Sequence, residues 1–472
     1  MLEDRNYDVA VVGGGLAGLI TANRLAQLGR RAVVLEQGGD EHYLCNSRYT
    51  GGVFHIALRD IMTDQHVLKQ AIIDSTGGFV TDTLAALIAT EGRRSVRWLQ
   101  EVGVRFMKAD VAEHRNWMLA PPVLKRPGLH WQGRGGDVTL HTLEANLVRL
   151  GGALARDARA QSLIMEGDRC GGVRVRQSEG EVRYRAGAVV IADGGFPGNL
   201  DLLRQYVCAQ PEKLKQRTAG TGRGDGLCMA VAAGARTLGL NRFYGHVLSR
   251  DALTNDKLWP QPYLDPVVTA SIMVGPAGER FVDEGRGGVY VANAIAQLAD
   301  PLSASVVFDQ AIWDSAGRNG LIPSNPNLPE VGGTLLQAGS IAELAQKLGC
   351  QPERLQATVD AYNAAIQSGA LASLSPPRRI TRYPAQPIAV APFYAAPVCS
   401  GITTTMGGIA VNEHAQALRE DGSAIAGLYA AGGAAGGLEG GPEVGYVGGL
   451  VKCGVTGLRA AEHIVGTVSA SV

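Results

Sequence analysis

The sequence predicts an α/β fold with two lobes, and three observations support this prediction. The chain has 472 residues, which is more than one ordinary hydrophobic core can serve. Apolar residues make up 46% and charged residues 19%, a balance typical of soluble globular proteins. The chain also begins with a strand–helix–strand pattern in residues 7–35. Strands that alternate with helices in this way usually build a parallel sheet.

The elements of this first unit follow from the spacing of apolar residues. Residues 7–12 form a short and nearly all-apolar run, as in a strand that is buried on both faces. Residues 16–28 have helical spacing, and Gly29 is expected to end that helix. Residues 32–35 form a second buried strand that leads directly to Glu36. Together they predict a complete βαβ unit.

A glycine motif of the form G-x-G-x-x-G occupies the turn before the helix, at Gly13, Gly15 and Gly18. Gly13 allows a tight turn, Gly15 lets the backbone approach a pyrophosphate, and Gly18 lets the helix lie close to the strand. The helix start favours phosphate, and Glu36 can accept hydrogen bonds from ribose hydroxyls. We therefore predict a Rossmann-like dinucleotide-binding domain, with a glycine-rich turn that binds nothing as the alternative. These residues alone do not distinguish FAD from NAD.

The segment after the second strand, residues 45–52, reads CNSRYTGG. Here the chain resembles the flavoprotein subunits of the fumarate reductase and succinate dehydrogenase superfamily. In that superfamily a Gly-Gly-Asn-Ser/Thr…Gly-Gly segment wraps the pyrophosphate and reaches the flavin ring, so the resemblance implies FAD. The succinate dehydrogenase branch attaches FAD covalently through a histidine of this segment. No histidine stands here, so we expect non-covalent FAD, with a linkage through Cys45 as the alternative.

Further segments resemble the same superfamily along the chain, at residues 133–160, 188–196, 221–234 and 425–432. We expect a helix after Asp137 that runs to Leu150, a helix after Gly226 that runs to Gly234, and a strand over residues 153–159. Asp193 departs from the usual Thr or Ala, and Gly433 replaces the usual acid. The cofactor-binding residues that the motif and the resemblance imply are Gly13, Gly15, Leu16, Ala17, Gly18, Glu36, Gln37, Asn46, Ser47, Thr50, Gly51, Gly52, Ala160, Asp193, Gly194, Gly195, Asp225, Gly432, Gly433, Gly448, Gly449 and Leu450.

The resemblance also implies the domain organisation. It predicts a three-layer ββα FAD-binding domain that is interrupted by an α+β capping domain, which closes over the flavin. We expect the FAD-binding domain in residues 1–240 and 403–472, and the capping domain in residues 241–402.

The composition of residues 241–402 agrees with a separate lobe. It contains proline-rich stretches at residues 321–329 and 375–392, and amphipathic patterns at residues 341–348 and 352–366. We interpret these two patterns as packing helices.

Arg286 is the predicted catalytic residue of the capping domain. Residues 278–284 match the "GxRFxNE" hairpin of the superfamily, and Arg286 follows shortly after. In fumarate reductases an arginine of this domain donates the proton, so the resemblance implies that Arg286 is a proton donor or a carboxylate clamp. The alternative is an arginine that caps its loop in solvent. Glu284 is either a proton relay to Arg286 or an ordinary ion-pair partner.

Three further candidates stand where the superfamily binds substrate. His246 matches the histidine of its "HPT" motif, with a structural histidine as the alternative. Residues 403–408 match "HHTMGG", but Thr404 replaces the histidine that holds substrate. Tyr446 lies at or near the clamping arginine of "GANRLGGN", as in the tricarballylate dehydrogenase branch. Tyr446 is a predicted acid/base or hydrogen-bond donor, or it stacks beside the flavin without chemistry.

These departures affect the predicted substrate. Fumarate reduction uses two arginines and two histidines, and this chain keeps about one of each, so a larger acid or a neutral carbonyl compound such as an enone fits better. We predict an FAD-dependent oxidoreductase that acts on a C–C bond next to a carboxylate or carbonyl, by hydride exchange with flavin N5. A ketone dehydrogenase of the 3-ketosteroid type, an isomerase or tailoring enzyme without net redox, and a flavin-bound redox sensor are the alternatives.

Other features limit the class of partner. Equal numbers of basic and acidic residues, 44 each, do not favour nucleic acid. Seven scattered cysteines without a CxxC pair predict no metal site and a reducing, cytoplasmic location. No apolar run approaches the ~20 residues of a membrane helix, and no signal peptide is expected. Only one G-x-G-x-x-G is present, so the expected electron partner is a separate protein, a quinone, a dye-like acceptor or O2.

Overall fold

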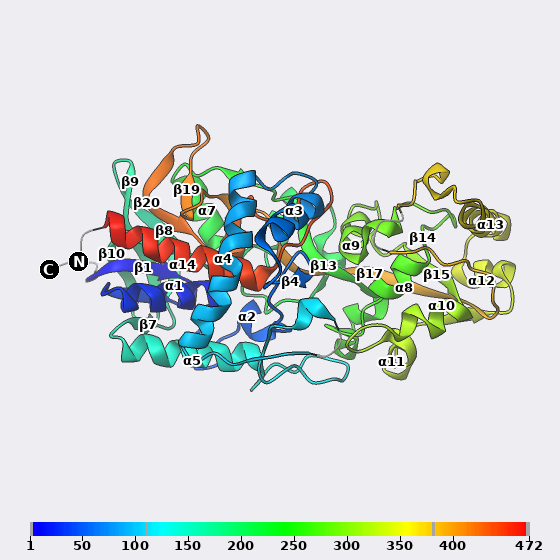
Figure 1. Ribbon diagram of the computed structural model, residues 1–472, viewed down its shortest axis with the longest axis horizontal. Coiled ribbons are helices and arrows are strands. Elements are labelled where there is room, and N and C mark those ends of the chain that lie inside the picture. The colour runs from blue at the N-terminus through cyan, green and yellow to red at the C-terminus, as the bar shows by residue number, and fades with distance from the viewer. Residues whose placement is uncertain (1–2, 110–111, 380–382, 469–472) are drawn as a thin grey trace.

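The computed structural model describes residues 3–109, 112–379 and 383–468. Figure 1 shows an elongated molecule whose two ends contain different helices and strands. An eight-stranded sheet and its helices lie at the end that holds both termini, and α10 to α13 lie at the opposite end. The predicted α/β fold class is confirmed, and the predicted boundaries at residues 240 and 402 stay predictions.

The strands are β1 Glu3–Val12, β2 Ala32–Leu35, β3 His55–Ile56, β4 Arg59–Asp60, β5 Phe106–Met107, β6 Met118–Leu119, β7 Ala153–Ala155, β8 Arg159–Glu166, β9 Arg169–Gln177, β10 Gly180–Ile191, β11 Lys215–Gln216, β12 Thr237–Leu238, β13 Phe243–Ser249, β14 Ile272–Val274, β15 Ser305–Asp309, β16 Leu336–Ala338, β17 Phe393–Thr405, β18 Gly408–Ala410, β19 Gln416–Leu418, β20 Ala424–Ala430 and β21 Ala435–Gly436. The α-helices are α1 Leu16–Gln27, α2 Asn46–Tyr49, α3 Gln65–Thr76, α4 Asp82–Glu101, α5 Gly135–Arg149, α6 Leu200–Tyr206, α7 Asp225–Ala232, α8 Asp265–Ala270, α9 Gly288–Ala296, α10 Gln310–Asp314, α11 Ser324–Glu330, α12 Ile341–Leu348, α13 Pro352–Ser368 and α14 Gly449–Thr467.

The eight-stranded sheet has the order β19-β20-β9-β10-β1-β2-β7, with β8 beside β9. Its centre is parallel, because β1 pairs in parallel with both β2 and β10. Both strands that flank β1 end at the same edge, and α1 starts there after the glycine turn. Helix α1 packs against α14 and α5, so the glycine turn is held between the sheet and three helices.

Two predicted strands differ from the structure. The first strand starts at Glu3 rather than residue 7, because β1 and β10 pair from Glu3 opposite Val182. The predicted strand over residues 153–159 is too long: β7 covers only Ala153–Ala155, and β8 begins at Arg159. Asp157 between them has a φ of +53°, a left-handed conformation outside the β region, and the strand ends before it.

The second sheet has six strands in the order β11-β17-β15-β14, with β13 and β16 also paired to β17. Strand β17 is the longest of this sheet and runs into the middle of the molecule, where Thr403 and Thr404 are reached. The predicted boundary at residue 402 therefore falls inside a strand.

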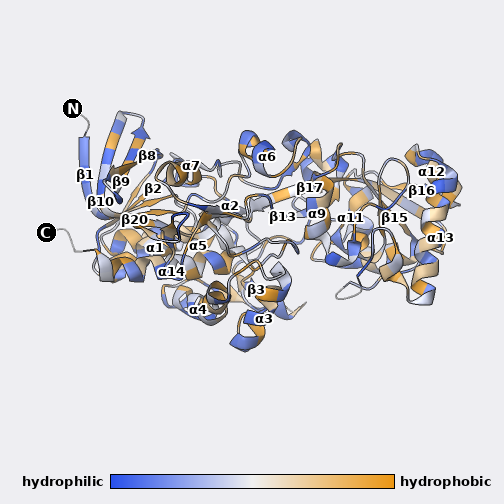
Figure 2. Cartoon of the chain, turned by 90° about the horizontal axis from the view of Figure 1, so that it is seen from above, coloured by the Kyte–Doolittle hydropathy of each residue, from blue (hydrophilic) through white to orange (hydrophobic). Residues whose placement is uncertain are grey.

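Helices α12 and α13 lie at the far end of this lobe and carry both hydrophilic and hydrophobic residues (Figure 2). Residues 380–382 of the predicted proline-rich stretch 375–392 lie outside the described residues. Within the described part of the chain, the helices are all too short or too polar to cross a membrane.

Candidate functional site

A cavity of about 990 Å³ lies where the two sheets approach each other. This volume is at the upper end of the ~300–1,000 Å³ range of small-molecule sites. Glycine-rich segments from the eight-stranded lobe line one part of it. Tyrosine, histidine and arginine side chains line the other part. The two parts therefore differ in what they can bind.

The turn before α1 requires glycine for two reasons that the structure makes explicit. Gly13 has a φ of +104°, and a Cβ there would stand 2.7 Å from the Ala192 carbonyl oxygen. A Cβ on Gly18 would stand 2.0 Å from the Gly13 carbonyl oxygen, which confirms the close approach of helix and strand. The start of helix α1, at Gly15, Leu16 and Ala17, lines the cavity, and its first turn has no acidic residue, so its positive end favours a phosphate.

Glu36 is buried at the end of β2 and lines the cavity. Its carboxylate accepts hydrogen bonds from the backbone N–H groups of Gly14 and Gly38, both at 2.8 Å. Burial raises the pKa of Glu36, and the two backbone donors oppose that shift. These contacts fix the carboxylate beside the glycine turn, where a ribose would be recognised.

Helix α2 presents the Asn46 and Ser47 side chains to the cavity. The Asn46 amide donates to the Thr403 carbonyl at 3.0 Å and accepts from the Ala219 N–H at 2.9 Å. The Ser47 hydroxyl accepts from the Leu16 N–H at 2.9 Å, at the start of α1. The segment is therefore tied to the glycine turn and to both lobes.

The preceding residue, Cys45, also lines the cavity. Burial raises the pKa of the Cys45 thiol to about 12, so it stays protonated at neutral pH and is a poor nucleophile. This supports the expectation of non-covalent cofactor binding.

The buried acid Asp193 has one carboxylate oxygen that is left for a polar ligand. Its Oδ2 accepts the Gly226 N–H at 2.7 Å, whereas its Oδ1 is buried and has no hydrogen-bond partner among the described residues. Burial raises the Asp193 pKa to about 7. An orphaned acceptor in this wall fits a ligand that carries hydroxyl or amino donors, as a dinucleotide does.

Most predicted cofactor residues line this cavity, and three do not: Gly18, Gly432 and Gly448. These three glycines shape the wall instead. The Gly432 N–H donates to the Thr456 hydroxyl at 2.9 Å, and the Gly448 N–H donates to Glu439 at 2.9 Å. The glycine-rich part of the cavity, with its helix start and acid, fits a dinucleotide.

The polar part of the cavity contains a chain of hydrogen bonds on β13. Tyr244 and His246 are two residues apart in this strand, so they share one face. The Tyr244 hydroxyl lies 3.0 Å from His246 Nε2, and His246 Nδ1 lies 2.6 Å from Asp265 Oδ2. Asp265 Oδ1 also accepts the Val247 N–H at 2.8 Å. Tyr263 stacks on the imidazole with a centroid distance of 4.4 Å, which fixes the ring further.

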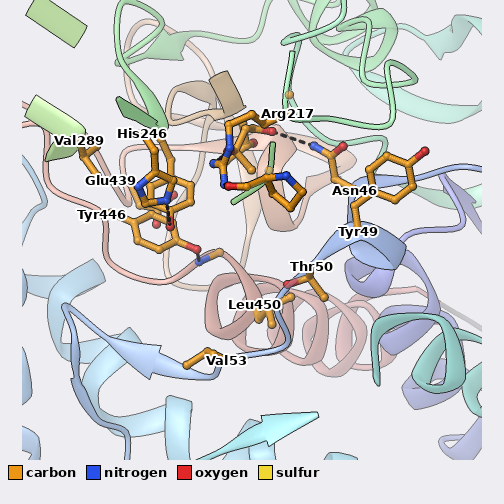
Figure 3. Close-up of a pocket in the computed structure, with 18 of the residues that line it drawn as sticks. Asn46, Tyr49, Thr50, Val53, Arg217, His246, Val289, Glu439, Tyr446 and Leu450 are labelled. Atoms are coloured by element: carbon orange, nitrogen blue, oxygen red, sulfur yellow. Dashed lines mark hydrogen bonds between the residues drawn. The ribbon is translucent and has the colours of Figure 1, made fainter. Parts of the chain in front are cut away.

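Tyr446, labelled in Figure 3, comes from the other lobe. It stacks on Tyr244, with centroids 3.7 Å apart and rings inclined by 15°. Its hydroxyl accepts the Gly449 N–H at 2.9 Å, at the start of α14. No acceptor for the hydroxyl hydrogen of Tyr446 is found among the residues that the structure describes. That hydrogen is available to a bound ligand.

The protonation states of His246, Tyr244 and Tyr446 follow from their burial and their hydrogen-bond partners. Burial lowers the pKa of His246, so the imidazole is neutral near pH 7. The Asp265 carboxylate only accepts, so Nδ1 carries the hydrogen and Nε2 accepts from Tyr244. Burial raises the pKa values of both Tyr244 and Tyr446, which keeps both phenols protonated.

A β-bulge explains why two consecutive threonines reach the cavity. Tyr244 pairs with Thr404 and Gly245 pairs with Ile402, so Thr403 is an extra residue in β17. Consecutive strand residues normally face opposite sides, and a bulge of this kind re-aims one of them. Both Thr403 and the predicted Thr404 therefore line the cavity. The Thr404 hydroxyl donates to the Thr405 carbonyl at 3.3 Å.

The structure brings four of the five predicted catalytic residues to the cavity: His246, Arg286, Thr404 and Tyr446. Arg286 is already paired, since its Nε donates to Glu443 at 3.0 Å and its guanidinium lies 3.6 Å over the Tyr290 ring. Glu284 does not line the cavity. It is fully buried and pairs with Arg280 at 2.6 Å and with Arg378 at 3.3 Å, as an ordinary ion-pair partner does.

Sequence reasoning assigned no role to Tyr244 and missed two further residues of the polar part, Asp265 and Arg217. Arg217 donates to the Thr403 hydroxyl at 2.6 Å and to the Pro260 carbonyl at 2.9 Å. Neither residue belongs to a motif, and only the folded chain brings them beside His246 and Thr403. Their side chains could have been found only from long-range contacts.

A group able to hold a metal ion lies outside the cavity. Ligand atoms of His42, Asp137 and His141 lie within 4.8 Å of one another, although the sequence predicted no metal site. The buried guanidinium of Arg48 already binds Asp137, and it pairs with Glu144 at 3.3 Å. This cation competes with a metal ion for the same carboxylate.

The chain is similar to known proteins in sequence and in fold. Residues 8–445 match the family model described as FAD binding domain. The chain is 24% identical to NADH:acrylate oxidoreductase of Vibrio harveyi over 91% of this chain and 47% of that protein, so it spans about half of that relative. It is 27% identical to 4-oxocyclohexanecarboxylate 2-dehydrogenase of Sinomonas cyclohexanicum, over 95% of this chain and 90% of that protein. The solved 3-ketosteroid delta1-dehydrogenase from Sterolibacterium denitrificans has a similar fold, with a TM-score of 0.75, 19% identity, and coverage of 98% of this chain and 100% of that chain.

Proposed function

The chain belongs to the FAD-binding domain family, its cofactor is FAD, and we propose that it is an oxidoreductase that adds or removes two hydrogens across a C–C bond next to a carbonyl or carboxylate. The similar proteins that act on acrylate and on 4-oxocyclohexanecarboxylate support this class of reaction. The observation that carries the proposal is the free hydroxyl hydrogen of Tyr446 beside the relay Tyr244–His246–Asp265.

The glycine-rich part of the cavity holds FAD in this proposal. The start of α1 and Ser47 bind the pyrophosphate, and Glu36 and Asp193 accept from hydroxyl groups of the adenosine half. Asn46, Leu450 and the start of α14 contact the flavin half. Bound FAD supplies a hydride acceptor or donor at its N5 atom.

Tyr446 activates the substrate. Its hydroxyl donates to the substrate carbonyl oxygen, while the Gly449 N–H donates to the hydroxyl oxygen from behind. This polarises the carbonyl and makes the neighbouring C–H more acidic. The phenol stays protonated because burial raises its pKa, so it acts as a donor over the whole neutral range.

Tyr244, His246 and Asp265 move the proton. In the dehydrogenation direction the Tyr244 oxygen takes the proton from the carbon next to the carbonyl as its own hydrogen passes to His246 Nε2. Asp265 holds the imidazole in the correct tautomer and stabilises the imidazolium. In the reduction direction the same bonds carry the proton to the substrate carbon.

The proposal includes a separate electron partner and a cytoplasmic location. A separate acceptor or donor serves the flavin, since one dinucleotide motif is present. The seven cysteines are free thiols, which supports a reducing, cytoplasmic location.

Anaerobic titration of the FAD-loaded protein tests the proposal. We expect a saturated ketone or acid to bleach the flavin absorption, or an enone or enoate to reoxidise the reduced protein. Turnover with no change in flavin redox state and no external acceptor would favour an isomerase instead. Failure of every ketone, acid, enone and enoate to change the absorption would contradict the proposal.

A further inference from the structure

Among the buried arginine and lysine side chains of the described residues, one has no carboxylate partner. Five are buried: Arg48, Arg217, Arg280, Arg378 and Lys452. Four of them contact a carboxylate within 4 Å, in the pairs Arg48–Asp137, Arg280–Glu284, Arg378–Glu284 and Lys452–Glu439. Arg217 has no such partner in the described part of the chain. A buried charge without a counter-charge is unfavourable, so Arg217 is an exception among the buried cations of the described residues.

The direct hydrogen-bond partners of Arg217 are polar but neutral, and the Asp265 carboxylate acts on it only from beyond ion-pair distance. It is 9% exposed, and its two terminal nitrogens donate to the Thr403 hydroxyl and the Pro260 carbonyl. A guanidinium has five N–H groups, so these two bonds leave donors over, and its Nε is among the buried atoms without a partner. Burial lowers the pKa of Arg217.

The position of Arg217 connects it to the substrate part of the cavity. Arg217 lines the cavity and lies between Asn46 and His246 in Figure 3. Its partner Thr403 is the bulged residue of β17, next to Thr404. Arg286 and Arg379 also line the cavity, and both pair with Glu443, whereas Arg115 lines it as a partly exposed side chain. Arg217 is therefore a buried cation in that part that is free to bind an anion.

We propose that Arg217 binds a carboxylate of the substrate, which makes the substrate an organic acid whose carboxylate is held apart from the carbonyl at Tyr446. This inference rests on the proposed function and names its substrate class. A guanidinium pairs with a carboxylate through two parallel N–H···O bonds, and it does so most strongly where water is excluded. A neutral enone would leave the charge of Arg217 buried and unpaired.

The test measures binding without turnover. Benzoate and benzamide have the same shape, cannot be dehydrogenated, and differ in charge. Each is titrated into the FAD-loaded protein, and the perturbation of the flavin absorption spectrum and the heat of binding are recorded. We expect benzoate to bind about 10- to 100-fold more tightly than benzamide, because a hydrogen-bonded charge pair is worth that much.

Variants at the same position connect this preference to Arg217. The Arg217→Met variant keeps the length of the side chain without its charge, and we expect it to lose the preference for benzoate. The Arg217→Lys variant keeps the charge without the planar fork and should retain part of it. If Arg217→Met does not fold, the wild-type comparison and Arg217→Lys decide the matter.

Three results would overturn the inference. Two of them concern the wild-type protein: equal binding of benzoate and benzamide, and no binding of either. The third is an unchanged benzoate preference in Arg217→Met, and a loss of FAD from that variant would assign Arg217 to the cofactor. None of these depends on C–C chemistry, so they are distinct from a failed anaerobic titration. Binding of benzoate through Arg217 in a protein that reduces or oxidises no acid would uphold the inference while the proposed function fails.

Discussion

Replacement of Tyr446 by phenylalanine separates the role of its hydroxyl from that of its ring. The phenyl ring that remains can keep the stack on Tyr244, whose centroid distance is 3.7 Å. The change removes the acceptor of the Gly449 N–H and the donor to the substrate carbonyl. Loss of one donor to a developing oxyanion costs about 10²–10³ in kcat. Loss of the bond to Gly449 costs about 1 kcal/mol of folding free energy.

The assay measures kcat, KM and the flavin spectrum of Tyr446→Phe with the best substrate found by anaerobic titration. We expect kcat to fall by about 10²–10³, with normal FAD content and a small decrease in Tm. Tyr394→Phe is the matched control, because the Tyr394 hydroxyl donates to Gln310 at 2.6 Å and does not line the cavity. A kcat of Tyr446→Phe within about threefold of the wild-type value would refute the reasoning, since a donor of this kind cannot be worth so little.

Three further predictions concern the relay, the buried ion cluster and the glycine turn. Burial lowers the pKa of His246, so the dehydrogenation rate should be constant above about pH 6.5 and fall at lower pH, as the imidazole becomes charged. Asp265→Asn should lower kcat by about 10²-fold or more across that pH profile. A pH profile of Asp265→Asn that is the same as that of the wild-type protein would contradict the relay. Glu284→Gln should lower the free energy of unfolding by about 3–5 kcal/mol, because two buried arginines lose their counter-charge; a lower kcat at an unchanged Tm would instead support the proton relay to Arg286. Gly13→Ala should yield a colourless protein, since the new Cβ would stand 2.7 Å from the Ala192 oxygen, and normal FAD content in the purified variant would speak against this fit.

The parts of the fold that sequence predicted well are those that local spacing determines. The helix predicted at residues 16–28 is observed as Leu16–Gln27, and the amphipathic pattern at residues 341–348 forms α12 at the same residues. The resemblance to the fumarate reductase and succinate dehydrogenase flavoproteins is confirmed at the level of the family, and so is FAD. The assignments of single residues to catalytic roles stay predictions.

The parts that sequence did not predict depend on partners far along the chain. Strand β1 extends to Glu3 because of β10, and the turn at Asp157 interrupts the single strand expected over residues 153–159. The lack of a carboxylate beside Arg217 is a property of the folded interior, and no spacing rule reveals it. Asp265 lies 19 residues after His246, and only the packing of α8 against β13 brings them together.

The stack of Tyr244 on Tyr446 has a consequence for how such enzymes can be divided and recombined. Tyr244 belongs to the sheet of β13 and β17, whereas Tyr446 precedes α14, which packs on the other lobe. The proton path and the carbonyl donor thus reside on separate halves and meet only when the halves are docked. A chimera that exchanges one lobe for that of a relative keeps its colour, but it regains turnover only if the two aromatic rings again lie face to face.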